Sequence, residues 1–252
     1  MLIVKVTLGS EFIVINVIEI LYQMKQGATA PYLCIGDNDK KYVIKRQRAG
    51  FEGCIKEWLL GNIGQAFGLP IPDCQLVNID GSLLEYNDNY LSEIGEGTAF
   101  ASEFIADLQE VNYQKLDNVS VDILRDLYVF DYWIRNADRN LTEQGGNPNL
   151  FYKQSSLDLI VLDHNLAFDN DFFKQEHSEI HACKRFWPAQ FDFEMQQKYE
   201  ERMRLSLQSW DDLVSKIPND WKANLIGFDG FIKKLKLILD KYEANLFWEE
   251  LK

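Results

Sequence analysis

Residues 130–140 read FDYWIRNADRN, and the segments that follow read GNPNLF at 146–151 and LIVLDH at 159–164. In order, this stretch predicts an apolar helix, an Asp-Arg turn, a loop rich in Asn and Gly, and two short apolar strands. The second strand ends in another aspartate. Because buried elements frame the polar turn, they can hold two carboxylates and an amide around a metal-bound phosphate. The stretch therefore predicts a centre suited to phosphoryl transfer.

Three side chains of this stretch supply the groups that such chemistry needs: Asp138, Asn147 and Asp163. Asp138 is predicted to accept or orient the proton of the acceptor hydroxyl. Asp163 and Asn147 are predicted Mg²⁺ ligands, with Asn149 the less favoured amide, because Mg²⁺ prefers oxygen and keeps several waters. Arg139 is expected to pair with Asp138 or a nearby carboxylate and hold the turn. Each Asp or Asn alone is also a common turn former, so the prediction depends on their joint order.

The whole chain has the composition of an ordinary globular protein. It has 252 residues, of which 46% are hydrophobic and 13% aromatic, and its formal net charge is -13. That charge argues against binding a nucleic-acid backbone. No apolar run approaches the ~20 residues of a membrane helix, and the start lacks the features of a signal peptide. With four cysteines and no Cys-x-x-Cys pair, we expect a cytoplasmic protein with neither a nucleic-acid nor a membrane partner.

Secondary-structure patterns divide the chain into a strand-rich first part and a helix-rich second part. We expect an α+β fold with an N-terminal lobe at 1–105 and a helical C-terminal lobe at 106–252. Ser120 is a candidate cap for the helix that precedes the Asp-Arg turn. Strands are predicted at 2–6, 11–15, 32–35, 41–45, 75–79, 82–86 and 98–105, with 17–24 either helix or strand, and helices at 52–67, 121–135, 211–216 and 228–247.

The first part contains a second set of candidates for phosphate binding. Residues 25–31 read KQGATAP, a loop of small residues whose backbone N–H groups can approach a phosphate, with Gly27, Ala28 and Thr29 at its centre. Lys45 ends a predicted strand and Glu57 lies in the helix that follows. Either residue alone would be expected to face solvent. Together they can pair, and such a pair would fix the lysine.

These segments resemble those of the HipA-like kinases, and most closely the compact, stand-alone branch of that family. Residues 136–140, 146–150 and 161–164 look like its catalytic and metal-binding segments. Residues 26–31 and 42–45 resemble its N-terminal loop and its nucleotide-binding lysine. Glu57 looks like the glutamate that pairs with this lysine, and Ser102, Glu103 and Phe104 look like the hinge that meets adenine. The resemblance covers roughly residues 16 to 170.

The resemblance implies a bilobal, protein-kinase-like fold that binds ATP and Mg²⁺. In this reading Gly27, Ala28, Thr29 and Lys45 bind the phosphates, and Glu57 orients Lys45. Glu103 and Phe104 border adenine. It also implies transfer of the γ-phosphate to a serine or threonine of a protein substrate. Some relatives are toxins held by a DNA-binding partner, so a toxin–antitoxin role with a small antitoxin-like partner is part of what the resemblance implies.

The sequence departs from the family pattern immediately after Asp138. Asn140 stands where the family usually has histidine, and the loop lengthens so that Asp138 and Asn147 are nine positions apart (138 to 147), where kinases have about five. This motivates one alternative, a pseudokinase or nucleotide-dependent binding module without transfer. A second alternative is a kinase that acts on a small molecule or a lipid headgroup.

Residues 177–183 contain His177, His181 and Cys183, which together suggest a possible metal site. Histidines four positions apart can share one face of a helix and bind zinc. No fourth ligand has a clear spacing, and the surrounding residues are polar. We therefore expect the start of a surface helix at this position.

Overall fold

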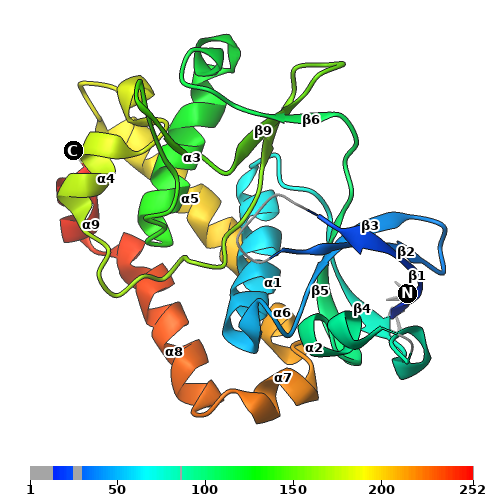
Figure 1. Cartoon of the computed structure of the whole chain (residues 1–252). Coiled ribbons are helices and arrows are strands. Elements are labelled where there is room, and N and C mark those ends of the chain that lie inside the picture. Colours follow the sequence, from blue (N-terminus) through cyan, green and yellow to red (C-terminus); the bar gives the residue numbers. More distant parts are fainter. Residues whose placement is uncertain (1–13, 25–29, 86, 252) are drawn as a thin grey trace, which may run out of the picture.

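The computed structural model describes residues 14–24, 30–85 and 87–251 of the chain. A small β-barrel forms the N-terminal part, helices form most of the C-terminal part, and the long helix α1 (Gly50–Phe67) lies between them (Figure 1). The barrel strands are β1 (Ile15–Gln23), β2 (Tyr32–Gly36), β3 (Lys41–Lys45), β4 (Cys74–Ile79) and β5 (Gly97–Glu103).

The five strands follow the order β1-β2-β3-β5-β4, and a parallel pairing of β1 with β4 closes the barrel. The strands predicted at 32–35 and 41–45 are present as β2 and β3, which pair as an antiparallel hairpin. Side chains along β3 alternate, so that Tyr42 and Ile44 enter the barrel core. Val43 and Lys45 consequently lie on the outer face, where both line a cavity. The strand pattern thus decides the side on which Lys45 is presented.

Two ambiguities near the start of the chain are resolved in part. Residues 17–24, for which helix and strand were both open, belong to β1 up to Gln23. The strand predicted at 2–6 lies outside the described residues. Of the strand predicted at 11–15, only Val14 and Ile15 are described.

The strand predicted at 82–86 is wrong over residues 82–85, and residue 86 lies outside the described residues. Residues Gly81–Leu83 form a 3₁₀ helix instead, because the Asp80 carboxylate accepts a hydrogen bond from the Ser82 N–H at 2.9 Å. This local side-chain bond offers the backbone an alternative to a strand ladder. The chain then enters the short helix α2 (Asp88–Glu93) before returning to the barrel as β5.

The C-terminal part packs helices around α3 and also contains two small sheets. One sheet has the order β10-β9-β6 and the other pairs β7 with β8. The strands are β6 (Leu108–Glu110), β7 (Asn140–Thr142), β8 (Gly145–Asn147), β9 (Leu150–Lys153) and β10 (Leu159–Val161). The helices are α3 (Val121–Trp133), α4 (Lys174–Ile180), α5 (Phe193–Ser206), α6 (Trp210–Ser215), α7 (Asn219–Asn224), α8 (Phe228–Leu239) and α9 (Asn245–Leu251).

Two of the predicted helices differ from the observed ones in their caps or in where they end. Ser120 stands before α3, but its side chain makes no capping hydrogen bond. The predicted helix at 228–247 is two helices, because α8 ends at Leu239 and a 3₁₀ turn leads into α9. The Leu239 carbonyl at that break accepts a hydrogen bond from the buried Trp133 indole at 2.7 Å. A buried polar group on α3 is thereby satisfied by the interrupted helix.

Helices from the C-terminal part hold α1 in place. The Trp58 indole donates to the Leu213 carbonyl at 3.0 Å, which attaches α1 to α6. The guanidinium of Arg202, on α5, donates to the carbonyl of Phe67 at the last residue of α1, at 3.0 Å from Nε. Because α1 also packs against β4 and β5, its position relative to both parts of the molecule is fixed by contacts along its length.

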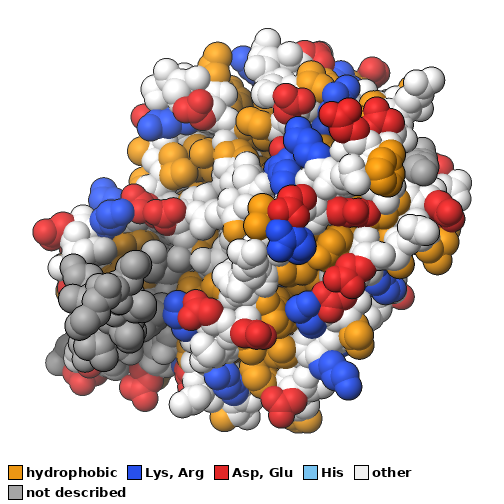
Figure 2. All heavy atoms as spheres, turned by 180° about the vertical axis from the view of Figure 1, so that it is seen from behind, with side chains coloured by type: hydrophobic (Ala, Val, Ile, Leu, Met, Phe, Trp, Pro, Cys, Tyr) orange, Lys and Arg blue, Asp and Glu red, His pale blue; other side chains and the backbone are white. Residues whose placement is uncertain are grey.

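The surface mixes charges of both signs. Figure 2 shows acidic and basic side chains interspersed between apolar strips on the face it presents, where no broad basic area is visible. Within the described residues, none of the helices has the length and apolar character needed to cross a lipid bilayer.

Candidate active site

A cavity of about 490 Å³ lies where the barrel, α1 and the small three-stranded sheet meet. Its volume is that of a typical small-molecule site. Much of its wall is apolar, and polar side chains gather at one end. The apolar wall includes Val43, Ile71, Phe100, Leu108, Phe151 and Val161, and the polar end includes Lys45, Glu57, Asn147, Asn149 and Asp163.

Lys45 is held between two carboxylates at the polar end. Its Nζ lies 2.5 Å from Glu57 Oε1 and 3.2 Å from Asp163 Oδ2. The second Glu57 oxygen accepts the backbone N–H of His164 at 3.2 Å. The predicted pairing of Lys45 with Glu57 is therefore present, and it joins β3 and α1 to the segment after β10.

The pKa shifts of these three groups follow from burial and mutual charge. Burial lowers the pKa of Lys45, but the two carboxylates outweigh it and raise that pKa above its ordinary value. Burial also opposes ionisation of Asp163, yet Lys45 holds the pKa of Asp163 below its ordinary value. For Glu57, burial dominates over Lys45 and raises the pKa. Lys45 and Asp163 are therefore charged at neutral pH.

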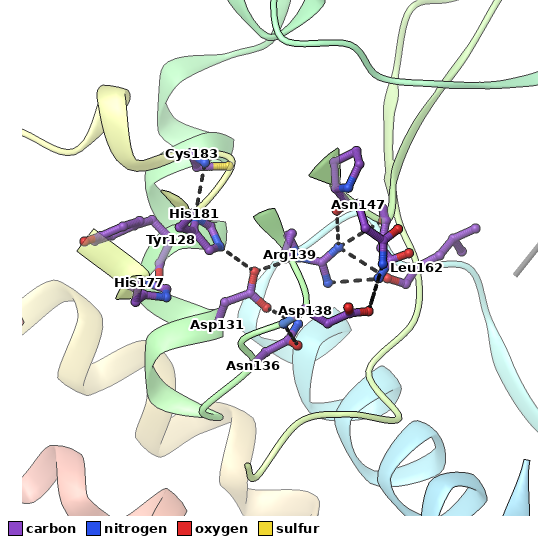
Figure 3. Close-up of polar contacts among 12 residues, drawn as sticks. Tyr128, Asp131, Asn136, Asp138, Arg139, Asn147, Leu162, His177, His181 and Cys183 are labelled. Atoms are coloured by element: carbon purple, nitrogen blue, oxygen red, sulfur yellow. Dashed lines mark hydrogen bonds and ion pairs between the residues drawn. The ribbon is translucent and has the colours of Figure 1, made fainter. Parts of the chain in front are cut away.

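Asp138 lies next to both asparagines. Its Oδ2 accepts a hydrogen bond from Asn147 Nδ2 at 3.1 Å (Figure 3). The same oxygen accepts a second one from Asn149 Nδ2 at 2.8 Å. Because each amide donates through its nitrogen, each amide oxygen remains available as a ligand. The geometry gives no preference to Asn147 over Asn149, although the sequence favoured Asn147.

The lengthened loop after Asp138 folds into a hairpin that runs out and back. β7 pairs with β8 so that Asn140 lies opposite Asn147, and the Asn147 N–H donates to Asn140 Oδ1 at 3.1 Å. Gly146 permits this close pairing, since a Cβ at that position would lie 2.4 Å from the Asn140 carbonyl oxygen. The extra residues form the tip of the hairpin, so they do not separate Asn147 from Asp138.

Arg139 ties together the backbone segments that carry the polar groups. Its guanidinium donates to the carbonyls of Pro148 at 3.0 Å, Asn149 at 2.9 Å and Leu162 at 3.3 Å. Its Nε donates to Asp131 Oδ2 at 2.6 Å. Of the two partners that the sequence left open for Arg139, the structure shows the nearby carboxylate, Asp131, and not Asp138. One planar side chain thus fixes the loop before β9 and the residue before Asp163.

Asp131 and His181 complete this network (Figure 3). The sequence pattern did not indicate Asp131, and it indicated His181 only as a possible zinc ligand. His181 Nδ1 accepts the Cys183 N–H at 3.1 Å, so its Nε2 carries the proton and donates to Asp131 Oδ2 at 2.9 Å. Burial raises the pKa of Asp131, but Arg139 and His181 outweigh it and hold that pKa well below its ordinary range. The available signal was a charged residue inside an apolar helix, which requires a buried partner.

The histidines weighed as a zinc site are structural. The surface helix expected there is present as α4, and most of its side chains are exposed. It begins at Lys174, however, and its His177, like the following His181, is buried against α3. His177 Nε2 lies 3.2 Å from the Tyr128 carbonyl, to which it donates. Among the described residues no group of three or more His, Cys, Asp or Glu side chains is placed to hold a metal ion.

The remaining predicted binding residues lie at the other end of the cavity. Glu103 and Phe104 both line it. Their N–H groups donate to the carbonyls of Asp73 at 2.8 Å and Lys41 at 2.9 Å, so adenine would have to meet the carbonyls of this segment or the following Ile105. Three further candidates lie outside the described residues: Gly27, Ala28 and Thr29.

The polar end of the cavity fits a hard divalent cation. One carboxylate, that of Asp163, and two amide oxygens, those of Asn147 and Asn149, are an all-oxygen set of the kind that binds Mg²⁺ together with water and phosphate. Among the described residues that line this cavity, Lys45 is the cationic one, and its ammonium group suits phosphate oxygens. The donor set therefore matches a metal–nucleotide complex better than a dedicated protein-only metal site.

A family model described as HipA-like kinase matches residues 17–251. This chain belongs to the HipA-like kinase family. The match extends through the C-terminal helices, well beyond the residues 16 to 170 on which the resemblance was seen in the sequence. A comparison with curated protein sequences finds no match.

Solved structures similar to this member of the HipA-like kinase family are also kinases. One is the proinflammatory kinase CtkA of Helicobacter pylori, with a TM-score of 0.57 and 12% identity, covering 94% of this chain and 96% of that chain. Another is a Golgi casein kinase with Mn and ADP bound, with a TM-score of 0.44 and 12% identity, covering 92% of this chain and 73% of that chain. The likeness to CtkA shows a kinase fold. Family and fold together support a kinase-type phosphotransferase.

Proposed function

We propose that this protein is an ATP- and Mg²⁺-dependent kinase that transfers the γ-phosphate of ATP to a hydroxyl group of a protein substrate. The observation that carries the proposal is the position of Lys45. It is held between Glu57 and Asp163 at one end of the cavity between the barrel and the helical part, 2.5 Å and 3.2 Å from their carboxylate oxygens. Asp138 lies next to the asparagines that line the same end.

The residues would divide the work as follows. Lys45 binds phosphate oxygens, and Glu57 keeps its ammonium group in place. Asp163 with Asn147 or Asn149 would hold Mg²⁺, which neutralises charge on the phosphates. Asp138 orients the acceptor hydroxyl and accepts its proton. At the other end, the carbonyl groups of the segment that starts at Glu103 would face the adenine.

Glu57 is kept in this position by the packing of α1. Its helix is attached to α6 through Trp58 and to α5 through Arg202, so the Lys45–Glu57 pair forms without a partner protein. We infer that the phosphate-binding end is pre-organised, which reduces the free energy that must be spent on ordering when nucleotide binds.

The test combines nucleotide binding with phosphate transfer. We expect ATP with Mg²⁺ to raise the melting temperature of the wild-type protein, and we expect Asp163→Ala to abolish the Mg²⁺-dependent part of that rise. Radiolabelled phosphate should pass from ATP to a protein acceptor in the wild type and not in Asp138→Ala. If ATP binds but no acceptor is labelled, the protein is a nucleotide-dependent binding module instead. If only a small molecule or a lipid headgroup is labelled, the acceptor is that molecule and not a protein.

A further inference from the structure

The short helix α2 ends close to the polar end of the cavity that contains Lys45. Its last residue, Glu93, is not among the described residues that line this cavity. Glu93 and Lys45 do line one smaller cavity together, with Tyr32 from β2 and Arg48 from the connection between β3 and α1. The Glu93 carboxylate therefore lies behind the side chains that would meet the phosphates.

The Glu93 carboxylate accepts hydrogen bonds from three different segments. Gln23, the last residue of β1, donates from Nε2 to Oε2 at 2.5 Å, and the Tyr32 hydroxyl, at the start of β2, donates to the same oxygen at 2.6 Å. Arg48 Nη1 donates to Oε1 at 2.9 Å. The hydrogen bond from Tyr32 holds the pKa of Glu93 below its ordinary value, although burial opposes it. One ionised group thus joins β1, β2 and the connection that leads from Lys45 into α1.

The strand ends joined in this way continue into wall residues of the cavity that contains Lys45. Met24 and Pro31 both line it, and the Met24 N–H donates to the Pro31 carbonyl at 2.8 Å. In the sequence these two residues flank the centre of the predicted phosphate-binding loop. Gln23 precedes Met24 and Tyr32 follows Pro31, so the carboxylate fixes the chain on both sides of this loop.

The end of α2 also holds the chain that follows Lys45. The Arg48 N–H donates to the Glu93 carbonyl at 3.0 Å. Arg46, the residue immediately after Lys45, donates from Nη1 to the Ile94 carbonyl at 3.2 Å. The same short segment therefore sets the position of the lysine relative to the strand ends on which the phosphate-binding loop is mounted.

We propose that Glu93 is a positioning residue for the phosphates of the bound nucleotide, acting through the strand ends and the lysine-bearing segment that it joins. This inference rests on the proposed function and adds a residue that the function did not use. An exposed ion pair with Arg48 would contribute little by itself. Here the carboxylate has donors on three segments, and Tyr32 is only 5% exposed, so removing the carboxylate leaves its hydroxyl without this acceptor and frees both strand ends.

The test measures the dissociation constant of ATP with Mg²⁺ by titration calorimetry, well below the melting temperature. We expect Glu93→Ala to raise this constant by about tenfold, because the phosphate-binding end loses its fixed geometry. Glu93→Gln keeps an acceptor oxygen for Tyr32, so it should recover most of the affinity. A purely structural role would lower the free energy of unfolding and leave the dissociation constant as it is.

A double-variant cycle checks the route through Tyr32. Tyr32→Phe removes the hydroxyl and keeps the ring, which packs edge-on against Tyr90, so it should raise the dissociation constant by a smaller factor than Glu93→Ala. If the two residues act as a unit, the double variant should bind ATP no more weakly than Glu93→Ala alone. Should Glu93→Ala fail to fold, Tyr32→Phe carries the test by itself.

Asp37→Ala is the matched control. Asp37 Oδ2 accepts an exposed hydrogen bond from Asn16 Nδ2 at 2.9 Å, at the opposite end of β1 from Gln23, and Asp37 does not line the cavity that contains Lys45. This variant should leave the dissociation constant unchanged. An unchanged constant in Glu93→Ala, an equal rise in Asp37→Ala, or effects of Tyr32→Phe and Glu93→Ala that simply add would overturn the role of Glu93 and leave the kinase intact. Failure of the wild type to bind ATP would instead contradict the proposed function.

Discussion

Asp131 and Arg139 form an ion pair that is wholly removed from solvent. Arg139 Nε lies 2.6 Å from Asp131 Oδ2, and both side chains have zero exposure. The pair connects α3 to three backbone carbonyls around the candidate active site. A buried pair of this kind costs desolvation energy, so its use here is better explained by positioning than by a gain in stability.

Removing the arginine should be strongly destabilising. We expect Arg139→Met to lower the free energy of unfolding by about 3–5 kcal/mol, because it leaves the Asp131 carboxylate buried and unpaired. Urea unfolding measures the change. The double variant Asp131→Leu with Arg139→Met should recover part of the loss while remaining inactive. Arg204→Met is the control, since its pair with Glu201 is exposed and should matter little. Equal effects of Arg139→Met and Arg204→Met would contradict this account.

Stability should fall as the pH drops below about 6.5. The chain has three histidines, and all three are buried. Burial lowers the pKa of His164 to about 3 and lowers the pKa of His177 and His181 below their ordinary value. The unfolded chain therefore binds more protons than the folded one below the unfolded pKa of about 6.5. Each histidine contributes about 1.4 kcal/mol per pH unit until its folded pKa is reached.

Urea unfolding at pH 7.5 and at pH 5.5 tests this sign and size. The free energy of unfolding should be lower at pH 5.5. The raised pKa of Glu57 acts in the opposite direction between pH 5.5 and 7, so the net dependence should be smaller than three protons but keep the sign set by the histidines. His177→Gln should reduce the dependence by about one proton, whatever it does to stability at pH 7.5. A stability that is unchanged or higher at pH 5.5 would be incompatible with three histidines that remain neutral in the folded protein.

Gly146→Ala should impair phosphate transfer with little loss of stability. The new Cβ would meet the Asn140 carbonyl oxygen at 2.4 Å and force β7 and β8 apart, which moves Asn147 away from Asp138. The hairpin tip is exposed, so the free energy of unfolding should change by less than about 1 kcal/mol. We expect a lower kcat and an unchanged affinity for the acceptor. The control is Gln144→Ala, at the hairpin tip, which should leave kcat unchanged. A normal kcat in Gly146→Ala would show that the position of Asn147 does not affect phosphate transfer.

The two asparagines can be distinguished by their Mg²⁺ dependence. If one amide oxygen is a ligand, its replacement by alanine should raise the Mg²⁺ concentration needed for half-maximal transfer, and aspartate at that position should restore it. We therefore expect Asn147→Ala or Asn149→Ala, but not both equally, to show this shift. The same measurement on Asp163→Ala shows how far the Mg²⁺ requirement rises when the carboxylate ligand is removed. A fall in kcat at unchanged Mg²⁺ dependence in both variants would assign the amides to orienting Asp138 alone.

Several barrel strands and several residues of the candidate active site could be predicted from local sequence. The hairpin at 32–45 follows from alternating residues around a polar turn, and α1 follows from apolar residues at helical spacing. Lys45 and Glu57 could be proposed as a pair because a strand and the next helix are neighbours in most folds. The 3₁₀ helix at Gly81–Leu83 was missed, since a single side-chain bond from Asp80 overrides the strand pattern.

Local sequence is enough to establish which residue types surround the Asp-Arg turn and in what order they occur. That order was sufficient for the family and for the candidates Asp138, Asn147 and Asp163. Only the tertiary structure decided that the extra residues after Asn140 form a hairpin, that Arg139 pairs with Asp131, and that His181 supports the pair from 50 positions away. The physical reason is that spacing along the chain carries no information on which buried charges meet. Burial requires that each has a partner, and only packing selects which one.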